Sequence, residues 1–177
     1  MSSVFLSEQP SDLIMKPFIS PLLILSFIFS FQFLGAQTTE APGDTALARG
    51  YLEEAKELTD KGDLEKALEK AKQAKKIYEI EKDELKEEIA EVLMQIGIIK
   101  YKKSEYAEAI ETLEMARSLQ DQIYQGNHEK IANTYYFLGV ANRLQGDHEA
   151  SFRWHSKALE MRRSLFGEIH SDVAMSY

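Results

Sequence analysis

Apolar and small residues recur along this chain at the three- and four-residue steps of a helical face. From residue 131 the series runs Ile131, Tyr135, Leu138 and then Ala141 or Asn142, and a second series follows with Phe152, His155, Leu159 and Arg162. The segment Gln145-Gly146-Asp147 separates them. Glycine can adopt the left-handed conformation that ends a helix, and aspartate can cap the next one. The pattern therefore predicts two helices joined by a tight turn.

The same pattern returns at a spacing of 42 residues. Ile89-Ala90 recurs as Ile131-Ala132 and again as Val173-Ala174, and the breaks Lys61-Gly62-Asp63 and Lys103-Ser104-Glu105 match the break at Gly146. Small residues keep step within each unit, at Ala67, Ala74, Ala109, Ala116 and Ala158. Gly97 and Gly139 lie mid-helix, where glycine costs about 1 kcal/mol relative to alanine. Such a cost is tolerable where two helices must approach closely. The 42-residue repeat of these features therefore predicts an array of stacked helix pairs.

These observations divide the chain as follows. We predict a linker at 37–44 and a helical repeat domain at 45–177, with units at about 48–89, 90–131 and 132–173 and a truncated fourth unit at 174–177. Natural arrays end with a helix whose outer face is polar. We therefore expect that the sequence is a fragment and that further repeats follow Tyr177.

The repeated register resembles a known family. Gly-Asp-x-x-x-Ala followed by alanine seven residues later, as at Gly62, Asp63, Ala67 and Ala74, is similar to the tetratricopeptide repeat. The 42-residue period and the segment 165–174 resemble the kinesin-light-chain variety and the N-terminal repeat regions of bacterial tetratricopeptide/CHAT-domain proteins. Ser171 departs from that variety at a usual proline, and Tyr136 and Phe137 at usual asparagines. The resemblance implies an all-α, right-handed superhelical solenoid of antiparallel helix hairpins.

The N-terminus predicts export. Met15-Lys16 precedes an apolar run at 18–34, and Leu34-Gly35-Ala36 offers small residues for cleavage after Ala36. Residues 1–36 are thus predicted to be a secretory signal peptide, with a retained membrane anchor as the alternative. Because the residues before Met15 are polar, translation from Met15 is a further alternative. A periplasmic or secreted protein is expected.

Composition and motifs exclude several classes of function. The net charge of −8 argues against nucleic acid as a partner, and the absence of cysteine removes thiol nucleophiles and thiolate metal sites. No glycine-rich phosphate loop occurs. His148 and His155 share a helical face but lack a third metal ligand, and the pairs Glu53-Glu54 and Glu87-Glu88 are typical of solvated helix faces. We expect no metal, no cofactor and no catalytic residue in this chain, whereas a longer parent protein could be an enzyme.

The resemblance also implies a binding surface. In such solenoids the first helix of each unit lines a concave face that binds an extended peptide or a helix. The corresponding residues are Arg49, Leu52, Lys56, Glu91, Met94, Ile98, Tyr101, Asn133, Tyr136, Val140 and Arg143. Trp154, in a second helix, is expected to be partly buried against the next unit.

These predictions favour an exported scaffold that binds a protein partner. One alternative is the N-terminal recognition region of a longer CHAT-type protease. The other is the sensor region of a membrane-bound signalling kinase. All three share one fold up to Tyr177 and differ beyond it.

Overall fold

The computed structural model describes residues 43–81 and 84–167, and within them the chain is all-helical. The elements are α2 (Gly43–Lys61), α3 (Leu64–Tyr78), the short 3-10 helix η1 (Glu79–Glu81), α4 (Lys86–Lys102), α5 (Tyr106–Ile123), α6 (Glu129–Gln145) and α7 (His148–Phe166). No strand occurs in these stretches, so the predicted all-α class is confirmed. The predicted signal segment at 1–36 and the truncated fourth unit at 174–177 lie outside the described residues, as does most of the linker at 37–44.

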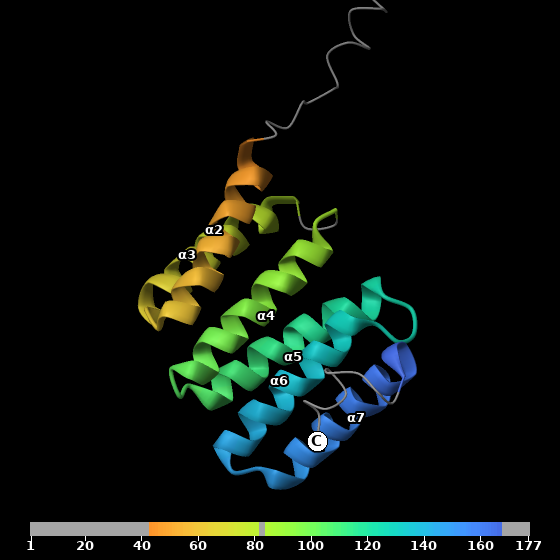
Figure 1. The fold of residues 1–177 in the computed structure, drawn as a ribbon. Helices are drawn as coiled ribbons and strands as arrows, with labels where there is room; N and C mark the ends of the chain where they lie inside the picture. Colours follow the sequence, from red (N-terminus) through yellow and green to blue (C-terminus); the bar gives the residue numbers. More distant parts are fainter. Residues whose placement is uncertain (1–42, 82–83, 168–177) are drawn as a thin grey trace, which may run out of the picture. The chain divides into compact units, whose positions relative to one another are not determined.

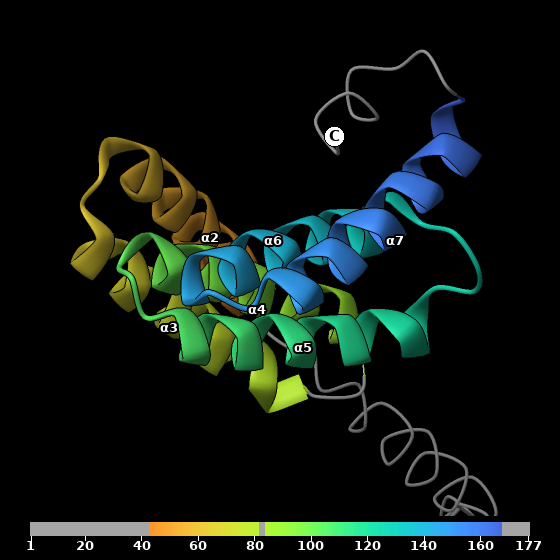
Figure 2. The ribbon, with the colours of Figure 1, turned by 90° about the horizontal axis from the view of Figure 1, so that it is seen from below.

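The six α-helices form three antiparallel hairpins, α2–α3, α4–α5 and α6–α7. Successive hairpins stack because α3 packs on α4 and α5 packs on α6. The first helices also contact one another, α2 with α4 and α4 with α6. Figure 1 shows this succession along the chain, and Figure 2 shows α3 and α5 together on one side of α4 and α6. The arrangement is the predicted solenoid of helix hairpins.

The hairpin turns lie where the sequence predicts them. Gly62 and Gly146 have φ angles of 81° and 97°, in the left-handed region that glycine adopts without steric cost. The carboxylates of Asp63 and Asp147 then accept hydrogen bonds from the backbone N–H of Lys66 and Ala150. In the second hairpin Ser104 takes the glycine position with φ of 66°, a conformation that is unfavourable for a residue with a Cβ.

The small residues allow the helices of a hairpin to approach closely. Ala67, Ala74, Ala109, Ala116 and Ala158 are all fully buried. A Cβ placed on Gly97 would lie 2.6 Å from Cγ of Leu113, and one on Gly139 would lie 2.7 Å from the ring of His155. Leu113 and His155 are one repeat apart. The corresponding pair in the first hairpin is Ala55 and Ala71, and both are fully buried. The expectation of close approach at both glycines is confirmed.

One detail of the third hairpin differs from the sequence-based expectations. Phe152 is 73% exposed, although the spacing predicted it on the same face as the buried Arg162. Its counterpart one repeat earlier, Ile110, packs against the core cluster beside α6, whereas no later helix within residues 43–81 and 84–167 covers Phe152. Trp154 is half-buried and stacks on Tyr135 of its own hairpin, while the following unit, against which we predicted it to pack, lies outside the described residues.

Candidate partner-binding face

The first helices expose a polar hollow. We call the exposed side of α2, α4 and α6 the first-helix face. Its hollow has a volume of about 370 Å³ and is lined by Arg49, Leu52, Glu53, Tyr78, Glu87, Glu88, Glu91 and Lys130. Helix periodicity explains the grouping, because residues three and four apart share one side of a helix, as Glu87, Glu88 and Glu91 do on α4.

Ion pairs cross this face from helix to helix. Nζ of Lys56 on α2 lies 2.8 Å from Oε1 of Glu91 on α4. Nζ of Lys130 on α6 lies 2.6 Å from Oε1 of Glu87 and 3.8 Å from Oε2 of Glu91. The hydroxyl of Tyr124 also donates to Glu87 over 2.8 Å. The α4 carboxylates therefore tie all three first helices together.

The pKa values follow from these contacts. Burial acts to lower the pKa of Lys56, but hydrogen bonds to Glu53 and Glu91 outweigh it, and the pKa lies above its ordinary value. Hydrogen bonds from Lys130 and Tyr124 hold the pKa of Glu87 below its usual range. Lys56 and Glu87 are therefore both charged at neutral pH.

Aromatic and basic side chains gather at the α6 end of the face. A guanidinium nitrogen of the buried Arg162 donates to Oδ1 of Asn133 over 2.7 Å, and the guanidinium carbon lies 5.3 Å from the ring centroid of Tyr136. The ring of His155 meets Tyr136 edge-on at 5.5 Å. Burial, Arg143 and Arg162 together lower the pKa of His155. Asn133 and Tyr136 are thus engaged with α7 while staying half-exposed.

The predicted groove residues occupy three kinds of position. Arg49 and Arg143 are exposed, and Lys56, Glu91, Met94, Ile98, Tyr101, Asn133, Tyr136 and Val140 are half-buried. Leu52 is only 3% exposed, so it forms part of the floor of the hollow. Lys56 and Glu91 contact each other, and Sδ of Met94 accepts from the hydroxyl of Thr134 over 3.5 Å. The structure therefore brings together the α2 and α4 residues, while those of α6 form a second group.

Sequence reasoning missed five of the eight residues that line the hollow. Glu53, Tyr78, Glu87, Glu88 and Lys130 line it but were not among the predicted residues. Glu87, Glu88 and Lys130 each lie one helical turn before a predicted residue on the same helix, so extending the same face by one turn would have found them.

The histidines and carboxylates of the described residues lie apart from one another or in contact with other side chains. The described residues contain no cluster of three or more histidine, cysteine or acidic side chains that could hold a metal ion. Both carboxylates of the pair Glu53-Glu54 contact cations, since Glu53 contacts Lys56 and Glu54 contacts Lys70. His128 stacks on Tyr124 with ring centroids 3.6 Å apart, and its Nδ1 accepts from the first turn of α6.

A membrane-spanning helix would need about 20 mainly apolar residues. None of the helices that the structure describes is long and apolar enough to cross a bilayer.

Solved structures share this architecture. The TPR domain of Arabidopsis FLU superimposes with a TM-score of 0.62 and 17% identity, covering 68% of this chain and 98% of that one. A putative kinesin light chain of Podosopora anserina with nearly identical TPR-like repeats gives a TM-score of 0.68 and 16% identity, covering 76% of this chain and 64% of that one. At these identities the likeness concerns the fold alone.

A curated relative and a family model match the sequence itself. The nuclear autoantigenic sperm protein of Oryctolagus cuniculus is 28% identical over 125 residues, which cover 69% of this chain and 18% of that protein. The chain thus spans less than a fifth of the length of that relative. Residues 88–164 match the family model of the tetratricopeptide repeat. With the repeated hairpins and the small residues at their contacts, this match shows that residues 88–164 carry tetratricopeptide repeats.

Proposed function

We propose that this chain is an exported scaffold that binds a polypeptide partner on its first-helix face and catalyses no reaction itself. Tetratricopeptide repeats generally mediate interactions between proteins, and the match over residues 88–164 supports this class of function. The observation that carries the proposal is the hollow of about 370 Å³ between α2 and α4, because it gives a partner side chain a recess on an otherwise ridged helical surface.

The chemistry of the face suits a peptide. Arg49 and Glu88 border the hollow, and neither has an ion-pair partner among the described residues. Each can therefore pair with an opposite charge or with a main-chain group of the partner. The half-buried Met94, Ile98 and Val140 supply apolar surface further along the face. Charged groups beside an apolar strip are what an extended segment or an amphipathic helix requires.

Site-specific photo-cross-linking in the native host tests the proposal. A photoreactive phenylalanine analogue replaces Ile98 or Val140 on the first-helix face, and Ser156, exposed on α7, is the control position. We expect one defined polypeptide adduct from the face positions and none from the control. The adduct should weaken when Arg49→Glu or Arg143→Glu reverses an exposed charge on that face. Equal adducts from all three positions would show that the first-helix face is not the binding surface.

Export is a separate part of the proposal. The basic residue, apolar run and small residues ending at Ala36 support it. N-terminal sequencing of the mature protein should give a chain that begins at Gln37. An intact N-terminus in the membrane fraction would instead favour the retained anchor.

A further inference from the structure

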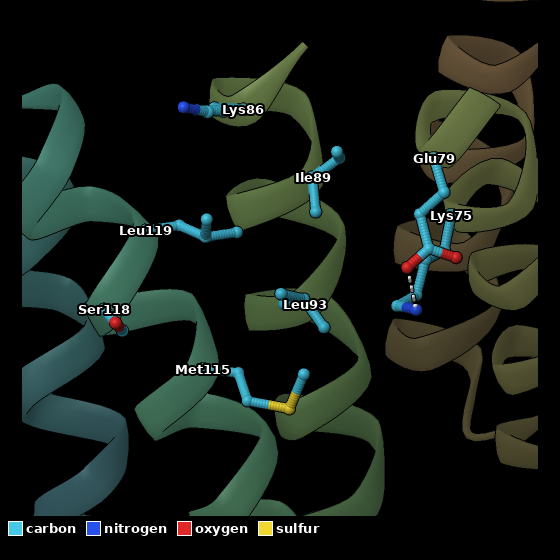
Figure 3. Close-up of a pocket in the computed structure, with 8 residues that line it drawn as sticks. All are labelled: Lys75, Glu79, Lys86, Ile89, Leu93, Met115, Ser118 and Leu119. Carbon is cyan, nitrogen blue, oxygen red and sulfur yellow. Dashed lines mark hydrogen bonds and ion pairs between the residues drawn. The ribbon is translucent and has the colours of Figure 1, made fainter. Parts of the chain in front are cut away.

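A second recess lies between the second helices, away from the hollow described above. We call it the α3–α5 groove. It has a volume of about 430 Å³ and is lined by Lys75, Glu79, Lys86, Ile89, Leu93, Met115, Ser118 and Leu119. Figure 3 shows Met115 and Leu119 reaching from α5 toward Leu93 and Ile89 on α4, with the Lys75–Glu79 ion pair of α3 on the opposite side. Met115 is 50% exposed, whereas Ile89 and Leu93 are only 8% and 4% exposed, so Met115 is the most exposed apolar side chain of the groove.

The chain contains an internal counterpart of this groove one repeat later, between α5, α6 and α7. Moving 42 residues along the sequence replaces the Lys75–Glu79 ion pair with the Arg117–Asp121 ion pair. The N–O distance is 2.6 Å in both. Ile89 likewise corresponds to Ile131. The two grooves are therefore built on the same plan, and their differences are informative.

The counterpart is filled by side chains of the protein itself. Leu93, Thr112 and Met115 correspond to Tyr135, Trp154 and Lys157. The rings of Tyr135 and Trp154 stack with centroids 5.3 Å apart, and Nζ of Lys157 lies 4.7 Å from the Trp154 ring centroid. The α3–α5 groove has an aliphatic side chain and a small one where its counterpart has two rings. The recess is thus present between the first two hairpins, whereas aromatic rings occupy the same place one repeat later, so the repeat fold does not by itself produce an open groove.

The two walls of the groove carry opposite charges. On α3, the exposed Lys72 and Lys76 lie three residues before Lys75 and Glu79, on the same side of the helix as those residues. On α5, the exposed Glu111 and Glu114 lie one turn before Met115 and Ser118. Within the residues that the structure describes, none of these four charges has an ion-pair partner. One wall is therefore basic, the other acidic, and the floor between them is apolar.

We infer that the α3–α5 groove is a docking site for an amphipathic helix of a partner protein. The apolar stripe of that helix lies on Ile89, Leu93 and Met115. Its acidic flank faces Lys72 and Lys76, and its basic flank faces the glutamates of α5. Charge complementarity on both sides, together with an apolar floor, selects this occupant over a uniformly charged or a wholly apolar one. The α3–α5 groove is separate from the first-helix face, so an experiment can refute binding at one site without refuting binding at the other.

The probe is a synthetic helix added to the full chain. It has about 18 residues, since shorter isolated helices are marginally stable. Leucines form one stripe, glutamates one flank and lysines the other. Because a helix can lie in the groove in either direction, exchanging the two flanks is no control. The control peptide keeps the leucines and carries lysine on both flanks. Calorimetric titration should show the mixed-flank peptide binding at least about tenfold more tightly than the control peptide.

Two variants locate the binding. Leu93→Tyr, Thr112→Trp and Met115→Lys together copy the filled counterpart and should weaken the mixed-flank peptide at least about tenfold. Since this triple change could disturb folding, the pair Lys72→Glu and Lys76→Glu provides an independent measurement on exposed residues only. That pair makes both walls acidic, so it should reverse the preference toward the peptide with lysine on both flanks. The matched control is Lys61→Glu at the exposed end of α2.

The peptide-binding measurements on these variants can either support or refute the α3–α5 groove as the site. Loss of binding in the filled variant, with a reversed peptide preference in the charge variant, supports the groove as the site. Unchanged binding in the charge variant overturns the proposal. So does a loss of binding in Arg49→Glu, because the peptide would then lie on the first-helix face. If sedimentation shows that the charge variant dissociates a dimer of the unliganded chain, a second copy is the occupant and the proposal of a separate partner is wrong.

Discussion

Adding one methyl group at Gly97 should destabilise the protein, although glycine is a poor residue for a helix interior. The perturbation is Gly97→Ala. The new Cβ would lie 2.6 Å from Cγ and 2.7 Å from Cδ2 of Leu113, and 3.4 Å from the backbone oxygen of Ala109. Leu113 is fully buried, so neighbouring side chains prevent it from turning away. The substitution therefore forces the two helices of the hairpin apart or strains the leucine.

The magnitude follows from two opposing effects. Overpacking of a tight core costs about 1–3 kcal/mol. Alanine in place of glycine in a helix interior raises the free energy of unfolding by about 1 kcal/mol. We expect Gly97→Ala to lower the free energy of unfolding by up to about 2 kcal/mol. The matched control is Gly50→Ala in α2, where a Cβ would meet nothing within 4 Å. That variant should be more stable than the natural protein by about 0.5–1 kcal/mol.

The sharper test changes both partners. Leu113→Ala alone should cost about 2–5 kcal/mol because it opens a cavity. In that background Gly97→Ala meets no leucine and reproduces the Ala55 and Ala71 pair of the first hairpin. It should then stabilise the protein by about 0.5–1 kcal/mol. Urea unfolding, followed by circular dichroism, measures the free energy of unfolding of the natural protein, of the two single variants Gly97→Ala and Leu113→Ala, and of the double variant. If the effect of Gly97→Ala has the same sign in both backgrounds, contact with Leu113 does not explain the glycine.

Three further predictions concern other parts of the array. The pKa of His155 lies below its ordinary value of 6.5, so the unfolded chain binds a proton more readily than the folded protein does. The free energy of unfolding should therefore fall as the pH drops below 6.5. His155→Leu should flatten this pH dependence, and His148→Gln, at an exposed position, should leave it unchanged. Ser104→Gly should raise the melting temperature by a few degrees because it removes a left-handed strain of about 1 kcal/mol, and an unchanged midpoint would contradict that strain. Lys130→Met should cost less than about 1 kcal/mol, and the loss should disappear in 1 M salt if the exposed ion pair with Glu87 is its cause.

The sequence predicts the hairpins well because their determinants are local. A glycine or serine that ends one helix and an acidic residue that begins the next lie within three positions, and they need no information from elsewhere in the chain. The small residues at Gly97 and Gly139 were also interpreted correctly, because an unfavourable residue in a helix indicates a steric requirement. The hairpin breaks and the mid-helix glycines both recur at a spacing of 42 residues, which a chance pattern would not do.

The face and the groove were harder to predict because they depend on pairs of helices. Lys130 and Glu87 lie on different helices, and nothing in the sequence states that their side chains meet at 2.6 Å. Phe152 fits the spacing of a buried face, yet its exposure depends on whether another helix lies beside it. Likewise, Leu93 and Tyr135 occupy the same place in the repeat, and only the packing shows that one leaves a recess and the other fills it. These properties arise from tertiary contacts and not from periodicity.

The paired positions at the centre of each hairpin also restrict the order in which mutations can accumulate. The three hairpins hold alanine with alanine, glycine with leucine, and glycine with histidine at the same two places. Enlarging the second position while an alanine remains at the first would produce a clash, whereas shrinking the first position beforehand leaves only a methyl-sized void. A lineage that moves from the Ala55–Ala71 pair toward the Gly97–Leu113 pair therefore avoids the clash if it passes through glycine opposite alanine.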